Sequence, residues 1–323
     1  MSDHPSSSGR RRVLRRGLAL GAGLVLAPAG RRAFAADAPS PGGTAAELVT
    51  RPIPATGERL PVIGIGTSRR YNVGPSEAER APLRSVLREL PRGGGRVVDT
   101  APSYGTAETV IGDLMAALGN RDALFLATKV GAGSAGAAAG RAEMEASLRR
   151  LRTERLDLVM VHNLAGIDAM LPVLREWKAA GRIRYLGMST SFDGQYDAFV
   201  AVMRREALDF IQVDYAIDNR SAEERILPLA VERGMAVLTN LPFGRGRVLR
   251  ALRGQPMPDW AAALGIASWA QFALKFVVSH PAVTAAIPGT ARPEYLVDNL
   301  AAGRAPLPDE ATRRRMAALV ARR

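Results

Sequence analysis

Short apolar runs alternate with longer amphipathic stretches from about residue 50 to the end of the chain, and this alternation constrains the fold most. Short apolar runs bounded by turn residues predict strands, and an apolar period near 3.6 predicts helices. Strands that alternate with helices form βαβ units and therefore a parallel sheet. The predicted strands are Val62–Gly66, Arg96–Asp99, Leu124–Thr128, Leu156–His162, Ile183–Ser189, Phe210–Tyr215, Ala236–Asn240 and Val283–Ile287.

Amphipathic helices are predicted between these strands, for example over Glu143–Leu151, Met170–Ala180 and Ala222–Arg233. Glycines follow two of them directly, at Gly181 and Gly234, where a helix commonly ends. The count of eight strands favours a closed (β/α)8 TIM barrel.

An open doubly wound sheet is the alternative. It would carry a glycine-rich phosphate loop after its first strand, followed by an acidic residue. Gly64-Ile65-Gly66 is only a fragment of such a loop and lies inside the predicted strand. We also expect a short β-hairpin ahead of the barrel, made by 49–54, a turn at 56–58 and a return at Leu60.

Composition excludes several classes of site. The 323-residue chain has no cysteine, which excludes disulfides and thiolate metal sites. Its three histidines, His4, His162 and His280, show no metal-ligand spacing, so we expect no metal and disfavour a metal-dependent hydrolase. Of the net charge of +13, the first 35 residues contribute +6, and the remaining +7 is scattered along predicted helices, which argues against a nucleic-acid partner.

The first 35 residues have the features of an export signal. A basic segment with Arg11-Arg12 precedes an apolar stretch over 17–29, and Ala33-Phe34-Ala35 provides small residues for cleavage after Ala35. The apolar stretch is too short for a permanent membrane span. Arg11-Arg12-Val13-Leu14-Arg15 resembles the twin-arginine motif, which we favour over an ordinary arginine-rich secretory signal. We expect a signal peptide over 1–35, a flexible linker over 36–48, a barrel over 49–323, and a periplasmic or secreted protein.

Four titratable residues lie at or just beyond the ends of three consecutive predicted strands: Asp99, Tyr104, Lys129 and His162. Each one alone has a structural explanation, such as a helix cap or a buried histidine. Catalytic residues of a barrel lie at the C-terminal ends of its strands, so all four could meet in one pocket.

These residue types suit the reduction of a carbonyl group. A free tyrosine has a pKa of about 10, and a nearby ammonium lowers that pKa by favouring the phenolate. Asp99 would hold Lys129 charged beside Tyr104, which would donate the proton. His162 could donate a hydrogen bond to the carbonyl oxygen.

With these residues in place, the sequence resembles the aldo-keto reductases over nearly the whole length that follows the signal. The resemblance implies Asp99, Tyr104, Lys129 and His162 as catalytic residues and hydride transfer from a bound nicotinamide without a metal. The segments that carry it are 99–105, Thr128-Lys129, 161–163, 187–189, 212–215, 287–290 and 298–300.

The same resemblance implies contacts to NADP(H). Ser189 and Gln212 match residues that bind the nicotinamide carboxamide. A second group matches residues around the 2′-phosphate and the adenine: Thr290, Arg292, Asp298 and Asn299. The planar guanidinium of Arg292 suits a phosphate, which favours NADPH over NADH. Arg245 and Arg247 are weaker candidates for the pyrophosphate, or belong to a surface loop.

Two positions depart from the family pattern beside the nicotinamide. Thr190 stands where an asparagine usually follows the serine, and Asn240 stands where an aromatic residue often stacks on the ring. Phe243 is a candidate to replace that stacking. The sequence therefore predicts an NADPH-dependent reductase of an aldehyde or ketone. The alternative is an NADP-binding barrel with a regulatory or redox-sensing role and little catalysis.

Overall fold

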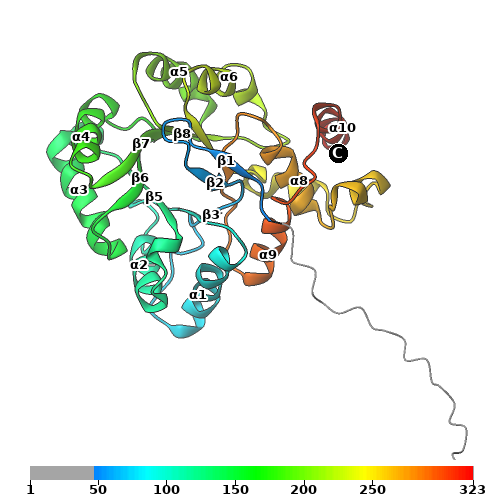
Figure 1. The fold of residues 1–323 in the computed structure, drawn as a ribbon, viewed down its shortest axis with the longest axis horizontal. Helices are drawn as coiled ribbons and strands as arrows, with labels where there is room; N and C mark the ends of the chain where they lie inside the picture. The colour runs from blue at the N-terminus through cyan, green and yellow to red at the C-terminus, as the bar shows by residue number, and fades with distance from the viewer. Residues whose placement is uncertain (1–46, 323) are drawn as a thin grey trace, which may run out of the picture. The chain divides into compact units, whose positions relative to one another are not determined.

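The computed structural model describes residues 47–322. The predicted export signal, and the predicted linker up to residue 46, lie outside them. The described residues form a barrel of parallel strands in the order β10-β9-β8-β7-β6-β5-β4-β3 (Figure 1). The strands are β3 (Ile65–Gly66), β4 (Val97–Asp99), β5 (Phe125–Val130), β6 (Leu156–His162), β7 (Ile183–Ser189), β8 (Phe210–Asp214), β9 (Ala236–Asn240) and β10 (Ala285–Ala286). The predicted (β/α)8 barrel is confirmed.

The first and last strands close the barrel. Isolated parallel bridges join Ile63 to Ala286 and Gly66 to Gly289. The backbones approach closely here, since a Cβ on Gly66 would lie 2.8 Å from the carbonyl oxygen of Ile287. Gly66 is therefore needed at the closure for space.

Helices surround the strands, as Figure 1 shows. They are α1 (Glu77–Arg92), α2 (Ala107–Leu118), α3 (Gly136–Leu151), α4 (Ile167–Ala179), α5 (Tyr196–Arg205), α6 (Ile226–Glu232), α7 (Arg247–Ala251), α8 (Trp269–Val278), α9 (Pro293–Ala301) and α10 (Glu310–Ala321). Gly181 and Gly234 follow α4 and α6 with φ of +73° and +63°, as the predicted helix ends require. None of the helices within 47–322 has both the length and the apolar character needed to cross a bilayer.

The barrel interior is filled by side chains. Phe125, Tyr185 and Phe210 pack together, with ring centroids 5.4–5.8 Å apart. Ile53 and Leu60 from the N-terminal hairpin belong to the same buried cluster. A second, larger core lies between the strands and the helices. The barrel is therefore a packed core with no pore.

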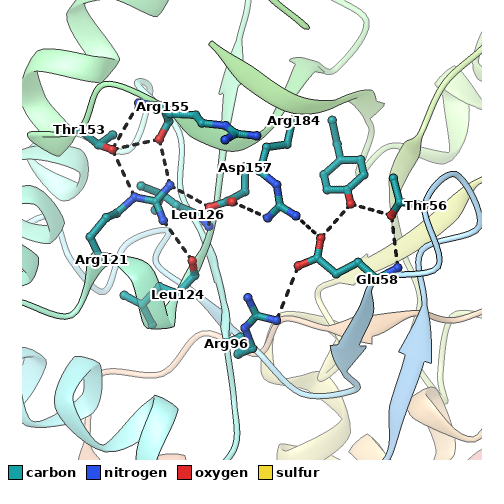
Figure 2. Close-up of polar contacts among 11 residues, drawn as sticks. Thr56, Glu58, Arg96, Arg121, Leu124, Leu126, Thr153, Arg155, Asp157 and Arg184 are labelled. Carbon is teal, nitrogen blue, oxygen red and sulfur yellow. Dashed lines mark hydrogen bonds and ion pairs between the residues drawn. The ribbon is translucent and has the colours of Figure 1, made fainter. Parts of the chain in front are cut away.

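The predicted hairpin is formed by β1 (Thr50–Pro52) and β2 (Arg59–Pro61) and is held at the N-terminal ends of the barrel strands. Figure 2 shows the polar network that fixes it. Glu58 accepts hydrogen bonds from Arg184 and from the Tyr185 hydroxyl, the latter at 2.8 Å. Arg184 also binds Asp157 at 2.8 Å, and Asp157 binds Arg121 at 2.8 Å. The hairpin thus closes one end of the barrel, and the candidate catalytic residues lie at the other.

Candidate active site

A buried ion pair joins the ends of β4 and β5. The Lys129 ammonium donates to both carboxylate oxygens of Asp99 at 2.7 Å and to the carbonyl oxygen of Thr100 at 2.9 Å. The two side chains are 1% and 4% exposed. All three ammonium hydrogens therefore have acceptors, as a charge removed from water requires.

Tyr104 and His162 adjoin this pair. Tyr104 lies in the turn between β4 and α2, and the Lys129 nitrogen is 5.2 Å from its ring centroid. The rings of Tyr104 and His162 meet edge to face, with centroids 6.1 Å apart. The structure thus brings all four candidate catalytic residues together, and Tyr104 and His162 retain some exposure at the mouth.

The pKa of Tyr104 is raised, which differs from the lowering expected from sequence. Burial is the largest cause and raises the pKa, Lys129 acts to lower it, and Asp99 again raises it. The sequence prediction included the ammonium and the carboxylate that holds it charged. It did not include burial, or the direct effect of the Asp99 charge on the phenol, and both raise the pKa of Tyr104. Burial acts to lower the pKa of Lys129, but Asp99 and Tyr104 outweigh it and leave this pKa raised. The site therefore holds a neutral phenol beside a charged ammonium.

His162 is neutral at ordinary pH. Burial, and then the Lys129 charge, lowers its pKa to about 4. The Ser103 hydroxyl lies 3.5 Å from Nδ1. A neutral imidazole keeps one N–H, so His162 can donate a hydrogen bond without bringing a second positive charge to the site.

Ser189 and Gln212 extend the site along the sheet. The strand register places His162 opposite Ser189 and Ser189 opposite Gln212, so the three residues form one row. The Gln212 side-chain nitrogen donates to Asp99 at 2.8 Å. The structure therefore brings these two predicted cofactor residues to the catalytic group.

The two departures from the family pattern contact each other. Asn240 donates its side-chain N–H to the carbonyl oxygen of Thr190 at 3.1 Å. The Thr190 hydroxyl donates to Gln195 at 2.7 Å, and Gln195 donates to the carbonyl oxygen of Asn163 at 3.0 Å. Asn240 thus links the end of β9 to the residue that follows β7, at the position where the family pattern often has an aromatic residue. Phe243 packs against the large core.

The four residues predicted around the cofactor phosphate and adenine lie on or beside α9. Asn299 donates to the Thr290 hydroxyl at 3.0 Å, so these two are held together. Arg292 is 60% exposed and pairs with Glu294. Asp298 accepts hydrogen bonds from Ser268 and Gln271, both at 2.7 Å, and so is bound to the start of α8.

Arg245 lies in the loop after β9, and Arg247 is the first residue of α7. Arg247 pairs with Asp218 at 3.0 Å. Within residues 47–322 no group of three or more His, Cys, Asp or Glu residues could hold a metal ion.

Two residues of this site were missed in the sequence. Thr67 donates its hydroxyl to the carbonyl oxygen of Asp99 at 2.9 Å. Asn72 accepts the backbone N–H of Thr106 at 3.1 Å. Gly105 has φ of +64°, and a Cβ there would lie 2.2 Å from Asn72 Oδ1, so this turn requires glycine. The position of Thr67 directly after a predicted strand was the signal that could have found it.

Comparison with known proteins agrees with this architecture. Residues 62–319 match the model of the aldo/keto reductase family. Methylglyoxal reductase YeaE of Escherichia coli is 30% identical over 247 residues, which cover 75% of this chain and 85% of that protein. Aldo-keto reductase YhdN of Bacillus subtilis is 32% identical over 208 residues, which cover 59% of this chain and 61% of that protein.

Solved structures show the same fold. An aldo-keto reductase from Klebsiella pneumoniae in complex with NADPH aligns with a TM-score of 0.70 at 29% identity and covers 85% of this chain and 95% of that one. An aldo/keto reductase of the same organism in complex with NADP and acetate aligns with a TM-score of 0.68 at 29% identity, over 82% and 93% of the two chains.

Proposed function

This chain belongs to the aldo/keto reductase family, and from that premise we propose that it reduces an aldehyde or ketone to an alcohol with NADPH and with Tyr104 as the proton donor. The observation that carries the proposal is the buried Asp99–Lys129 pair beside Tyr104 and His162. Such a pair places a fixed positive charge where a phenol must lose its proton.

Each side chain then has one task. NADPH, when bound, supplies the hydride that adds to the carbonyl carbon. The electron pair of the C=O bond moves to the oxygen, which takes the Tyr104 hydroxyl proton. Lys129 stabilises the resulting phenolate, which regains a proton from water. His162 donates a hydrogen bond to the same oxygen as its charge grows.

The residues present fit a bound NADPH. Ser189 and Gln212 lie in one row with His162, where they could bind the carboxamide. Arg292 follows Thr290 by two residues, and its guanidinium is 60% exposed and pairs with the exposed Glu294. A guanidinium can bind a phosphate with two parallel hydrogen bonds. The NADPH-bound Klebsiella structure supports the same assignment.

Turnover by the purified protein, with Tyr104→Phe measured alongside, tests this function. Methylglyoxal, named for the Escherichia coli relative, is the first carbonyl to supply. The mutation removes the proton donor and should lower kcat by about 10²–10⁴-fold. Tyr71→Phe is the matched control, since Tyr71 is fully buried and its hydroxyl has no partner within 47–322.

The outcomes separate two functions. Turnover that Tyr104→Phe abolishes and Tyr71→Phe preserves supports the reductase. Tight NADPH binding with no turnover of any carbonyl would favour the regulatory, NADP-binding barrel instead. Equal turnover by wild type and Tyr104→Phe would refute the role of Tyr104.

We further propose that residues 1–35 export the folded enzyme by the twin-arginine route, so that NADP(H) binds before export. The support is the motif at Arg11-Arg12. Replacing both arginines with lysine should keep the protein in the cytoplasm on cell fractionation. Unchanged export would favour an ordinary secretory signal. Mature periplasmic protein without bound nucleotide would contradict cofactor carriage and favour regeneration of the cofactor by the substrate.

A further inference from the structure

Arginine is the only charged residue type in four of the loops around Tyr104 and His162. These loops follow β3, β4, β5 and β6 and span residues 67–76, 100–106, 131–135 and 163–166. Their charged side chains are Arg69 and Arg70, with no Asp or Glu among them. Lys129 is neutralised by Asp99. Two acids from the following helices contact these loops and are already hydrogen-bonded: Glu79 accepts from the Ser76 hydroxyl at 2.6 Å, and Glu143 accepts from the Gly131 backbone N–H at 2.9 Å. Within the loops themselves, Arg69 and Arg70 are the charged side chains.

Hydrogen bonds hold the loop with these arginines at two points, at the end of β4 and in the turn that follows β4. At its start Thr67 binds the Asp99 carbonyl oxygen through its backbone N–H at 3.1 Å and its hydroxyl at 2.9 Å. Further along, Asn72 accepts from the backbone of Thr106, two residues beyond Tyr104. The backbone of Arg69 lies between these two anchors, in a loop that contacts the turn holding Tyr104.

Arg69 has an unusual backbone conformation and a side chain without a partner among residues 47–322. Its φ is +60°, a left-handed conformation that is unfavourable for a residue with a Cβ. Such conformations gather at ligand sites. The side chain is exposed and forms no hydrogen bond or ion pair with any residue in 47–322.

We infer that Arg69 binds an anionic group of the substrate, so that the enzyme prefers carbonyl compounds that carry a carboxylate or a phosphate. This inference rests on the proposed reductase function. A guanidinium in this loop attracts an anion and orients it through paired N–H donors. The carbonyl group of the same molecule would then reach Tyr104.

Arg70 is the matched control because it faces another part of the site. Its Cγ lies 3.8 Å from the position that a Cβ on Gly289 would occupy. Gly289 precedes Thr290, which belongs to the proposed phosphate end of the cofactor site. Arg70 thus lies where β3 and β10 meet to close the barrel, next to the proposed cofactor site.

Two aldehydes that differ in one charge test the inference. The anion 4-carboxybenzaldehyde and the neutral methyl 4-formylbenzoate present the same ring and the same reacting group. We expect wild type to show a kcat/KM about tenfold or more higher for the acid, and a charge-assisted hydrogen bond supports that size. The preference should shrink as salt is raised. Activity on 4-formylphenyl phosphate, compared with the acid, then shows which anion fits better.

The variants assign the preference to a residue. Arg69→Ala should lower kcat/KM for the acid about tenfold and leave the ester unchanged, with the fluorescence-measured Kd for NADPH unaltered. Arg69→Lys should keep part of the preference, since it keeps the positive charge but lacks the paired N–H donors of the guanidinium. Arg70→Ala should keep the full preference.

The failures are distinguishable. If neither aldehyde is reduced, nor any other carbonyl, the proposed function fails with the inference. If the ester is reduced as well as the acid, or Arg69→Ala slows both equally, only the inference is overturned. A loss of NADPH affinity in Arg69→Ala would also overturn it, since Arg69 would then serve the cofactor.

Discussion

Replacing Lys129 with methionine tests how much the buried ion pair of the active site contributes to the stability of the folded protein. Methionine has a similar length and no charge, so it removes three hydrogen bonds of 2.7, 2.7 and 2.9 Å while still filling space. Asp99 would remain buried, with Gln212 at 2.8 Å as its side-chain donor. Leaving one charge of a buried pair without its partner costs about 3–5 kcal/mol. That is a large part of the roughly 5–15 kcal/mol that stabilises a folded domain.

Urea unfolding at pH 7, followed by tryptophan fluorescence and circular dichroism, measures this loss. The matched variant is the double replacement Asp99→Asn with Lys129→Met, which removes both charges. It should regain about 2 kcal/mol over Lys129→Met alone, since no buried charge is left without a partner. Both variants should be inactive. A cost below about 1 kcal/mol for Lys129→Met, or a double variant no more stable than the single one, would refute the reasoning.

Three further changes test other parts of the structure. His162 has a pKa lowered from 6.5 to about 4, so between these pH values the unfolded chain takes up a proton on this residue and the folded chain largely does not. Between pH 6.5 and 4 the free energy of unfolding of wild type, measured with urea, should therefore fall by about 2 kcal/mol more than that of His162→Gln. Gly112→Ala should destabilise by about 2 kcal/mol in thermal unfolding, because its Cβ would lie 2.1 Å from a carbonyl oxygen of α3, whereas Gly194→Ala, with nothing within 4 Å, should not. Glu294→Gln frees Arg292 from an exposed ion pair and should tighten NADPH binding by up to about fivefold; an equal gain for NADH would count against a phosphate contact.

The strands could be predicted because strands buried on both faces leave continuous apolar runs. Each predicted strand overlaps an observed one. The observed strands are shorter than predicted chiefly at the two ends of the sheet, where β3 and β10 occupy only part of the predicted Val62–Gly66 and Val283–Ile287. These strands meet through isolated bridges at the closure, and a sequence pattern carries no information on how many residues pair there.

Much of the candidate site could also be predicted, since the topology of a barrel brings the ends of successive strands to one mouth. Its electrostatics could not. The pKa of Tyr104 depends on burial, which becomes known only when the surrounding loops are placed. The contact between Asn240 and Thr190 joins residues 50 positions apart, through side-chain directions that no local pattern encodes.

The closure between β3 and β10 has a consequence for the order in which the protein can fold during synthesis. The strands that carry Asp99, Lys129 and His162 are consecutive and emerge from the ribosome together. The first barrel strand, by contrast, cannot pair with the last strand until that strand has been made. The backbone N–H groups of Gly64 and Gly66 donate to the carbonyl oxygens of Ala286 and Pro288, more than two hundred residues later. The catalytic strands are thus available early in translation, while the edge beside Thr290 stays open until Ala286 and Pro288 have been synthesised.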